Sequence, residues 1–497
     1  MPPSDRRIWE HPILTFKRGR KIRFLFEGRE VEAYEGESVA AALYAIGIDV
    51  FSYSAKLGRP RGPFCMIGKC SSCFMIVDGI PNTRTCIEPV REGMRVERQR
   101  GLPPVPNVPP PGAEEEEVLE ADVAIVGGGP AGLAAALELA KRGISVALIQ
   151  DHFKLGGQLV KQTHKFFGSK DLFGGLRGFQ IAEEMASKLA SFPNARVLLQ
   201  SFAYGVFRGG WLGVASRSKL YRVKPRALIV ASGASEQYLA FPGNDLPGVM
   251  GAGGAQTLMN EYGIKPGERA LVVGSGNVGL IVSYQLLQAG VEVRAVLEIM
   301  PQIGGWFVHA AKVRRYGIPI LTRHTIKAVW GSERVEGATI TEVDERFNPI
   351  PGSERDVDCD LVLIAIGLQP DTRLFAQARA VMRWIPEVGG PVPLRTRYLE
   401  TTVPNMFVAG DSSGIEEATT AIIEGRIAAL SVASRLLEGS RAARAEEEAE
   451  KLLRFLWDEY RASPLLSRAR RGKELATVSV EELEELRRRF PPEVSFG

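Results

Sequence analysis

Cysteine is scarce in this chain and unevenly distributed. Only five of the 497 residues are cysteine, and none lies between Cys86 and Cys359. All of them except Cys359 fall within one short stretch, CMIGKCSSCFMIVDGIPNTRTC, which ends at Cys86. Thiols gathered this locally, with no secretory signal before them, predict metal or cluster ligands in a reducing compartment rather than a disulfide framework.

Long apolar runs and an excess of one charge are also missing. The first residues, MPPSDRRIWEHPILTFKRG, contain no continuous apolar region of a signal peptide, and no apolar run reaches the roughly 18 residues of a transmembrane helix. The 62 basic and 58 acidic residues nearly balance, at a net charge of +4. We therefore expect a cytoplasmic protein that binds no nucleic acid and associates with a membrane only peripherally, through partners.

Histidine offers no catalytic metal centre. The five histidines form neither an HExxH motif nor a close pair. His152 and His164 flank the tetrapeptide GGQL, where a flavin contact and a packing role both stay open. The same two alternatives apply to Trp306 and Phe307, which follow a glycine motif described below.

The chain is long enough for two to four domains. Residues 21–35 predict a β-hairpin, residues 36–47 predict a helix capped by Ser38, and a second hairpin turns at Asp78. With the cysteine loop between them, these elements suggest a β-grasp domain of about 100 residues.

The remaining chain changes character twice. A segment rich in proline and glutamate predicts a solvated linker. From about Val118, apolar strands alternate with helices, which is typical of parallel α/β layers. After Gly439 the pattern becomes helical, with a capping box of Ser479 and Glu482, and we expect this arm to pack on the same chain. The predicted divisions are a β-grasp domain (1–104), a linker (105–118), a nucleotide-binding domain in two parts (119–245 and 366–438), a second Rossmann domain (246–365) and a helical arm (439–497).

The cysteine spacing is C-x4-C-x2-C-x12-C, formed by Cys65, Cys70, Cys73 and Cys86. The x4/x2 triplet with a distant fourth cysteine is the plant-type [2Fe–2S] arrangement. Zinc sites usually pair two CxxC knuckles, and only one such pair exists here. A [2Fe–2S] cluster is therefore the main interpretation, with zinc and a vestigial site as alternatives. Cys359 is expected to be a buried residue at a strand edge.

The first glycine motif lies in ADVAIVGGGPAGLAAALELAKRGISVALIQD. Gly127, Gly129 and Gly132 form G-x-G-x-x-G after an apolar strand and before an alanine-rich helix, a setting that places backbone N–H groups against a pyrophosphate. The residue that normally holds the ribose is Gln150, followed by Asp151. Gln150 can bond a hydroxyl, but without charge assistance.

A second copy occurs in RALVVGSGNVGLIVSYQLLQAGVEVRAVLE. Its glycines are Gly274, Gly276 and Gly279, and here the acid is present as Glu298. A carboxylate at this place favours a free 2′-hydroxyl and argues against NADP.

Four motifs in order resemble the flavoproteins of the glutathione reductase and thioredoxin reductase type. They are GGGPAG (127–132), GGQL (156–159), LIVASGA (228–234) with LIAIGLQPD (363–371), and NMFVAGDSS (405–413). The resemblance implies a double dinucleotide-binding fold in which Asp411 accepts a hydrogen bond from a flavin ribityl hydroxyl, with Ala409 beside it. The motifs and the resemblance together nominate as cofactor-binding residues Gly127, Gly129, Pro130, Ala131, Gly132, Gln150, Asp151, Gly156, Gly157, Gln158, Ala231, Gly233, Gly274, Gly276, Gly279, Glu298, Gly367, Gly410 and Asp411.

One departure from that type is informative. Disulfide reductases carry a redox cysteine pair beside the flavin, and this chain has no cysteine in either glycine-motif region. Thiol chemistry is therefore excluded as the catalytic step, and no catalytic residue is nominated.

The order of cysteine domain, proline linker and double nucleotide fold resembles the α subunits of heteromeric sarcosine oxidase, dye-linked L-proline dehydrogenase, opine oxidase and hydrogen cyanide synthase. CMIGKCSSC and RTC, followed by REGMRVERQ, carry this likeness. The chain lacks the large folate-binding half of sarcosine oxidase α and the second cysteine cluster of some opine oxidase subunits, which favours the shorter dye-linked type.

This resemblance implies a division of labour. A flavoprotein β subunit, similar to D-amino-acid oxidase, would oxidise the amine or imino acid, and the present chain would pass electrons on. The implied cofactors are a [2Fe–2S] cluster, FAD in the first glycine motif (with ATP or NAD as alternatives there), and FMN at the subunit interface. The implied acceptor is a dye, a quinone or a ferredoxin-like protein, and a small additional subunit is a further candidate partner. Two other functions stay open, a self-sufficient NADH-dependent oxidoreductase and a nucleotide-stabilised scaffold.

Overall fold

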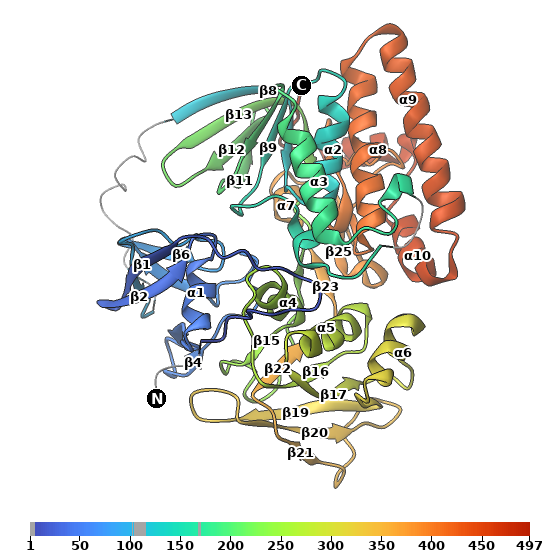
Figure 1. The fold of residues 1–497 in the computed structure, drawn as a ribbon. Helices are drawn as coiled ribbons and strands as arrows, with labels where there is room; N and C mark the ends of the chain where they lie inside the picture. The colour runs from blue at the N-terminus through green and yellow to red at the C-terminus, as the bar shows by residue number, and fades with distance from the viewer. Residues whose placement is uncertain (1–4, 102, 104–115, 167–169) are drawn as a thin grey trace. The chain divides into compact units, whose positions relative to one another are not determined.

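The computed structural model describes residues 5–101, 103, 116–166 and 170–497. The chain divides into two compact units, each assembled from two stretches of sequence (Figure 1). Unit 1 combines Met1–Asn107 with Glu236–Gly367, and unit 2 combines Val108–Ser235 with Leu368–Gly497. The predicted linker falls mainly on residues 105–115, which lie outside the described residues.

The N-terminal part of unit 1 is a five-stranded sheet with the order β2-β1-β7-β5-β6, in which β1 and β7 are parallel. Helix α1 accompanies the sheet, and a short hairpin, β3 and β4, precedes the cysteine loop. The bounds are β1 Lys21–Phe26, β2 Arg29–Tyr34, α1 Val39–Ala45, β3 Ser52–Tyr53, β4 Pro60–Arg61, β5 Phe74–Val77, β6 Ile80–Arg84 and β7 Arg95–Arg98.

The local signals of this part are confirmed. Both hairpins turn through left-handed residues, with φ of 51° at Asp78 and 81° at the following Gly79 in the second. Such a pair matches the type of turn whose twist suits two-residue hairpins. The Ser38 hydroxyl accepts a hydrogen bond from the Ala41 amide at 3.2 Å and so caps α1.

The second part of unit 1 is a parallel five-stranded sheet with the order β15-β22-β16-β17-β18, and a three-stranded antiparallel sheet, β19-β20-β21, is inserted in the chain between β18 and β22. Strands β16 and β22 pair so that Val273 lies opposite Ile364. The carboxyl ends of these strands therefore meet at one edge, where a nucleotide binds in such sheets. The bounds are β15 Val249–Gly251, α4 Ala252–Asn260, β16 Arg269–Val273, α5 Asn277–Gln288, β17 Glu292–Glu298, α6 Phe307–Arg315, β18 Ile320–Thr322, β19 His324–Trp330, β20 Gly337–Glu342, β21 Arg355–Val357 and β22 Leu361–Ile364.

The two parts of unit 1 are joined by buried polar contacts. The Tyr44 hydroxyl donates to the carbonyl oxygen of Pro266 at 2.5 Å, and the Arg18 guanidinium donates to the carbonyl oxygens of Tyr262 and Gly263 at 2.6 and 2.8 Å. Because buried donors without partners are costly, these contacts fix how the cysteine domain sits on the dinucleotide-type sheet.

Unit 2 is built on a seven-stranded sheet with the order β10-β9-β8-β13-β12-β11, with β26 also pairing β13. Strands β8, β13 and β26 are parallel, and Val126, Val230 and Val408 lie side by side at their carboxyl ends. The bounds are β8 Glu116–Val126, β9 Val146–Ile149, β10 Ala195–Leu198, β11 Phe202–Phe207, β12 Trp211–Ala215, β13 Leu220–Val230 and β26 Met406–Val408.

Helices α2, α3 and α8 cover one face of this sheet, as Figure 1 shows. Their alanine- and leucine-rich surfaces form one core with strand residues such as Val123 and Ile229, while Phe375 of α7 packs in a separate core on the other face. The bounds are α2 Pro130–Ala140, α3 Gly178–Ala190, α7 Arg373–Gln377 and α8 Ala418–Leu436.

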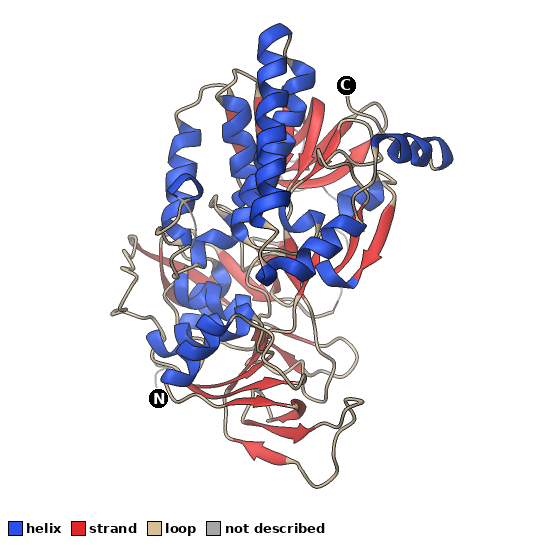
Figure 2. Cartoon of the chain, turned by 90° about the vertical axis from the view of Figure 1, so that its right-hand side faces the viewer, coloured by secondary structure: helices blue, strands red, loops and turns tan. Residues whose placement is uncertain are grey.

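The C-terminal segment is helical and packs within unit 2, in agreement with the prediction that it packs on the same chain. Leu453 and Trp457 belong to the same core as α2 and α8, and the long helices run side by side (Figure 2). A π-helical turn follows α9, and the Ser479 hydroxyl accepts a hydrogen bond from the Glu482 amide at 3.1 Å. The bounds are α9 Gly439–Arg454, the π-turn Phe455–Tyr460, α10 Ser467–Leu475 and α11 Val480–Arg489.

The remaining strands are short: β14 Ala234–Glu236, β23 Leu368–Pro370, β24 Met382–Ile385 and β25 Gly390–Pro393. No helix among the described residues is both long and apolar enough to cross a bilayer.

Candidate functional site

The four clustered cysteines converge in the structure. Cys65, Cys70 and Cys73 precede β5, and Cys86 follows β6, so the β5–β6 hairpin folds the fourth thiol back onto the first three. Cys65 and Cys73 are 2% exposed, Cys86 is fully buried, and Cys70 is partly exposed. The set thus has a buried side and a side near the surface.

The thiols contact one another in pairs. Hydrogen bonds from Cys70 and Cys86 hold the pKa of Cys65 well below its ordinary value, and Cys86 lowers the pKa of Cys73 in the same way. Among the described residues, no three histidine, cysteine, aspartate or glutamate side chains are placed to hold a single metal ion. The contacts run from Cys70 through Cys65 and Cys86 to Cys73, so all four thiols lie close together, and thiolate is the form that ligates iron.

Backbone amides complete this thiol set. The Gly68 amide donates to Cys86 Sγ at 3.2 Å, and Met66 and Gly68 have φ of 54° and 75°. The left-handed φ at Gly68 favours glycine there, and an added Cβ would also lie 2.9 Å from the movable end of the Ile87 side chain. Amide hydrogen bonds to sulfur are a recognised means of tuning such clusters.

Helix α4 supports the cysteine loop, a role that sequence reasoning missed. The Gly251 amide donates to the carbonyl oxygen of Phe64 at 3.2 Å, and a Cβ on Gly254 would collide with that same oxygen. The run GAGGAQ (251–256), directly after a strand, was the available signal, because glycines at a helix start allow a close backbone approach.

Tyr238 lies over the partly exposed side of the thiol set. Its ring stacks on Phe64 with centroids 4.4 Å apart, and 60% of the residue is exposed. Burial raises the pKa of Tyr238, and the Cys70 and Cys65 thiols add to that shift. An aromatic side chain therefore stands between the thiols and solvent.

The first glycine motif forms the expected strand–turn–helix in unit 2. Gly127 has φ of 105°, and a Cβ there would collide with the Ala231 carbonyl. A Cβ on Gly132 would collide with the Gly127 carbonyl. Helix α2 then begins with Gly129 as N-cap and Pro130 in its first turn. The amide-rich helix start therefore faces the strand edge, as anion binding requires.

Gln150 directly follows β9 and lies beside this loop. Its Oε1 accepts a hydrogen bond from the Gly128 amide at 2.6 Å, and its Nε2 donates to Asp151 Oδ1 at 3.1 Å. The glutamine thus stabilises the loop itself, and its acceptor oxygen is already used by a backbone amide.

The GGQL segment closes against the same loop. The Gly156 amide donates to the Gly128 carbonyl at 2.8 Å, and a Cβ on Gly157 would stand 2.8 Å from the Gly129 Cα. Gly156 and Gly157 both have positive φ, and Gln158 is exposed in the turn that follows.

The other predicted residues of unit 2 come from the ends of β13 and β26. The Gly233 amide donates to the Ser412 hydroxyl at 2.9 Å, and a Cβ on Gly410 would lie 3.0 Å from that of Ala131. Burial raises the pKa of Asp411 to about 6. The glycine turn 127–132, the loop after β13 that begins with Ala231, and the loop after β26 therefore meet at one edge of the sheet.

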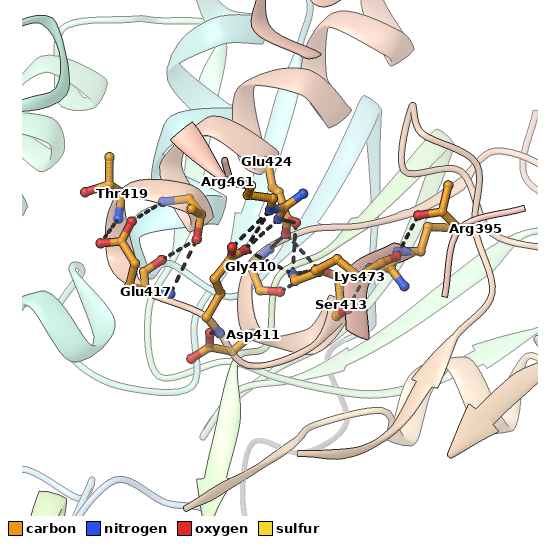
Figure 3. Close-up of polar contacts among 12 residues, drawn as sticks. Arg395, Gly410, Asp411, Ser413, Glu417, Thr419, Glu424, Arg461 and Lys473 are labelled. Carbon is orange, nitrogen blue, oxygen red and sulfur yellow. Dashed lines mark hydrogen bonds and ion pairs between the residues drawn. The ribbon is translucent and has the colours of Figure 1, made fainter. Parts of the chain in front are cut away.

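Close to Asp411 lies a buried charge cluster, most of which Figure 3 labels, and which sequence reasoning also missed. Every side chain in it is at most 2% exposed, although three are cations and two are carboxylates. Each residue taken singly is typical of a solvated charge, so the sequence carried no signal for the cluster. The members are Arg395, Glu416, Glu424, Arg461 and Lys473.

The second glycine motif repeats this geometry in unit 1. Gly274 has φ of 107°, and Cβ atoms on Gly274 and Gly279 would collide with the carbonyls of Ala365 and Gly274. Glu298 Oε2 accepts from the Ser275 amide at 3.1 Å and from the Ser275 hydroxyl at 2.5 Å.

Two further glycines of unit 1 leave room at this edge of the sheet. A Cβ on Gly276 would have no heavy atom within 4 Å, and one on Gly367 would meet only the Gln237 side chain, at 3.5 Å.

The remaining thiol is structural. Cys359 is fully buried just before β22, and burial raises its pKa to about 12. A thiol with so high a pKa is a poor nucleophile at neutral pH.

Comparison with known proteins supports both halves of this description. Residues 121–425, more than half of the chain, match the family model of pyridine nucleotide-disulphide oxidoreductases. Residues 19–101 match the model of the 2Fe-2S iron-sulfur cluster binding domain. The predicted fold class and the two cofactors, a [2Fe–2S] cluster and FAD, are thereby confirmed.

Similar proteins include subunits of amine-oxidising enzymes. The alpha subunit of sarcosine oxidase from Rhizobium meliloti is 26% identical over 57% of this chain and 35% of its own length. An opine oxidase subunit from Agrobacterium tumefaciens is 25% identical over 63% of this chain and 66% of its own length. The chain thus spans less than two thirds of either relative.

Among solved structures, L-proline dehydrogenase from P. horikoshii is similar, with a TM-score of 0.66 and 28% identity over 89% of this chain and 79% of that one. The resemblance to this group of oxidoreductases, drawn first from the cysteine and glycine motifs, is confirmed. The chain belongs to the pyridine nucleotide-disulphide oxidoreductase family, with an N-terminal domain that binds a 2Fe-2S cluster.

Proposed function

We propose that this chain is the electron-transfer subunit of a heteromeric dehydrogenase or oxidase acting on an amine or imino acid of the proline, hydroxyproline, sarcosine or opine class. One observation carries the proposal. A convergent set of four cysteines is built onto a dinucleotide-type sheet, in a family member whose sequence has no redox cysteine pair.

The names of the relatives support this assignment. The sarcosine and opine oxidase relatives are named as subunits, and the similar solved structure is an L-proline dehydrogenase. By this analogy a partner flavoprotein similar to D-amino-acid oxidase oxidises the C–N bond, FMN sits at the boundary between the two proteins, and a dye, a quinone or a ferredoxin-like protein accepts the electrons.

The residues of this chain divide the work. Cys65, Cys70, Cys73 and Cys86 hold the cluster, and the Gly127–Gly132 turn with Asp411 holds FAD. A bound flavin accepts two electrons and releases them singly, as a one-electron [2Fe–2S] centre requires. The protein's part is to hold the centres, exclude water from the thiols and tune them through amide and hydroxyl hydrogen bonds.

The test is reconstitution with a partner. The chain is co-purified with a flavoprotein similar to D-amino-acid oxidase, and proline or sarcosine is added without oxygen. We expect the electron paramagnetic resonance signal of a reduced [2Fe–2S] cluster. The Cys73→Ser variant should lose that signal, and Cys359→Ser should keep it because Cys359 lies outside the thiol set. Substrate oxidation with a cluster that stays oxidised would refute the proposal.

One observation favours a second function, direct oxidation of NADH. Glu298 is in place at the end of β17, where it can bind a ribose hydroxyl, and Gly276 leaves open space in front of the loop. NADH that bleaches the flavin of the isolated chain within one turnover time would support this alternative. A bleaching rate far below turnover would leave electron transfer from a partner flavoprotein as the function.

A further inference from the structure

The buried charge cluster connects the C-terminal segment to the loop that carries Asp411. Glu424 of α8 is its centre, because its two carboxylate oxygens have different partners. Oε2 accepts from the Gly410 amide at 3.0 Å and from the Ser413 hydroxyl at 2.7 Å. Oε1 accepts from Arg461 at 2.6 Å and from Lys473 at 2.9 Å (Figure 3).

A second connection runs through Glu416. The Arg461 guanidinium contacts the Glu416 carboxylate through two nitrogens, at 3.0 and 2.5 Å. The backbone amide of Glu416 donates to Asp411 Oδ1 at 3.3 Å. The π-helical turn Phe455–Tyr460 directly precedes Arg461, and Trp457 stacks on its guanidinium at 4.6 Å. Such turns often mark functional positions in helices.

Lys473 also contacts the loop itself. Its ammonium donates to the Ser413 hydroxyl at 2.6 Å, and Arg395 donates to the Ser413 carbonyl at 2.9 Å. Arg461 and Lys473 of the C-terminal segment, with Arg395 from an earlier part of the chain, therefore surround the turn Gly410–Ser413 and the Glu424 carboxylate that binds it.

The Glu424 carboxylate depends on the cations that surround it. Removing one partner of a buried pair leaves an uncompensated charge, which costs far more than the pair contributes as a whole. Burial alone would raise the pKa of Glu424, but the Lys473, Arg461 and Arg395 cations lower it to about 2, so Glu424 stays ionised. Without Lys473, its carboxylate would have to gain a proton or move toward other donors, and the Gly410 turn would move with it.

We propose that Lys473 and Arg461 are positioning residues of the nucleotide site. Acting through Glu424 and Glu416, they hold the loop from Gly410 to Glu417 in the shape that receives a ribityl or pyrophosphate group. The C-terminal segment 439–497 is then part of the nucleotide site. This inference rests on the proposed role of that loop in holding FAD.

The experiment compares FAD affinity among variants of the full chain after flavin removal. Lys473→Met should weaken FAD binding at least tenfold. The double variant Lys473→Met/Glu424→Gln removes both charges and should recover most of that loss, which a simple packing role would not predict. Arg470→Met is the matched control, because it breaks an exposed ion pair with Glu474 on the same helix.

Two further measurements separate positioning from unfolding. Cluster absorbance reports unit 1, which contains none of these residues, and should stay at the wild-type level. Arg461→Lys keeps the charge but loses the two-nitrogen contact with Glu416, and it should weaken FAD binding severalfold even if Lys473→Met does not fold.

Affinities within twofold of wild type in Lys473→Met and Arg461→Lys, or a double variant no better than the single one, would overturn the inference alone. A wild-type chain that binds no flavin would overturn the proposed FAD site and this inference together.

Discussion

The two glycine motifs have nearly the same backbone and different acceptors. Gly127 and Gly274 have φ of 105° and 107°. A Cβ added to either would collide with the carbonyl of an alanine that directly follows a neighbouring strand. The amide of the next residue is bound in both, by Gln150 in the first motif and by Glu298 in the second. The backbone of the turn is therefore set by glycine sterics, and the side chain that accepts the amide is neutral in the first motif and a carboxylate in the second.

Their surroundings differ as well. The first motif meets the Gly410 turn, which stands on the buried charge cluster. At the second motif the contacts to Glu298 come from Ser275 and from the Met300 amide. Three sets of changes test this contrast.

The largest effect is expected from the last glycine of each motif. Gly132→Ala and Gly279→Ala force a Cβ into a backbone carbonyl, which cannot move without distorting the strand. We expect loss of nucleotide binding by at least 100-fold and destabilisation by roughly 1–3 kcal/mol or more. Flavin content and thermal unfolding measure the two effects.

Gly129→Ala and Gly276→Ala are the controls. Added Cβ atoms there have no neighbour within 3.9 Å, so stability without nucleotide should hold while affinity falls, because these glycines let the backbone approach a pyrophosphate. Full flavin content in Gly132→Ala would contradict the steric argument.

A smaller effect is expected from exchanging the acceptors. Glu298→Gln removes a charge-assisted hydrogen bond and should weaken NADH binding about tenfold, near 1.4 kcal/mol. Gln150→Glu should strengthen binding of an adenine nucleotide by less than that, because the new carboxylate would face Asp151, which now accepts from the Gln150 amide.

Titration calorimetry with NADH and with ADP measures both changes. An NADH affinity unchanged by Glu298→Gln would show that the two acceptors do not distinguish the motifs.

The smallest effect is a pH dependence confined to the first motif. Burial raises the pKa of Asp411 from 3.8 to about 6. An ionised carboxylate is the stronger acceptor for a hydroxyl, so FAD affinity should rise severalfold as pH rises through 6. The folded chain holds this proton more tightly than the unfolded chain, so flavin-free stability should fall over the same window, from about pH 4 to 6.

Asp411→Asn should flatten both profiles. Among the charged groups that act on Asp411, Glu424 stays ionised through this range because its pKa is held at about 2. A stability that instead rises between pH 4 and 6 in wild type and not in the asparagine variant would contradict the assigned shift.

Local patterns predicted most of the architecture. The cysteine spacing, the two G-x-G-x-x-G turns and the Asp78 hairpin are each encoded within a few neighbouring residues, and the structure confirms their backbone forms. Burial of Cys359 and packing of the C-terminal helices on the same chain also agree with prediction.

What escaped prediction depends on distant residues. Nothing near Lys473 or Glu424 in the sequence indicates that their side chains meet, because a charged residue on a helix ordinarily faces solvent. The bond from Gly128 to Gln150 and the seat of Phe64 on Gly251 and Gly254 likewise require three-dimensional packing. The roles in cofactor binding assigned to individual residues of both motifs stay predictions.

The seating of Phe64 against α4 matters to anyone dividing this molecule. A fragment that begins at the first glycine motif would lack Phe64 and would expose the glycine-rich start of α4 and the apolar residues around it. Replacing the N-terminal domain by another ferredoxin would raise the same problem. The replacement must pack against the start of α4 as Phe64 does, in addition to carrying the four cysteines. A fragment or chimera that keeps residues 1–107 together with 236–367 retains the whole of compact unit 1.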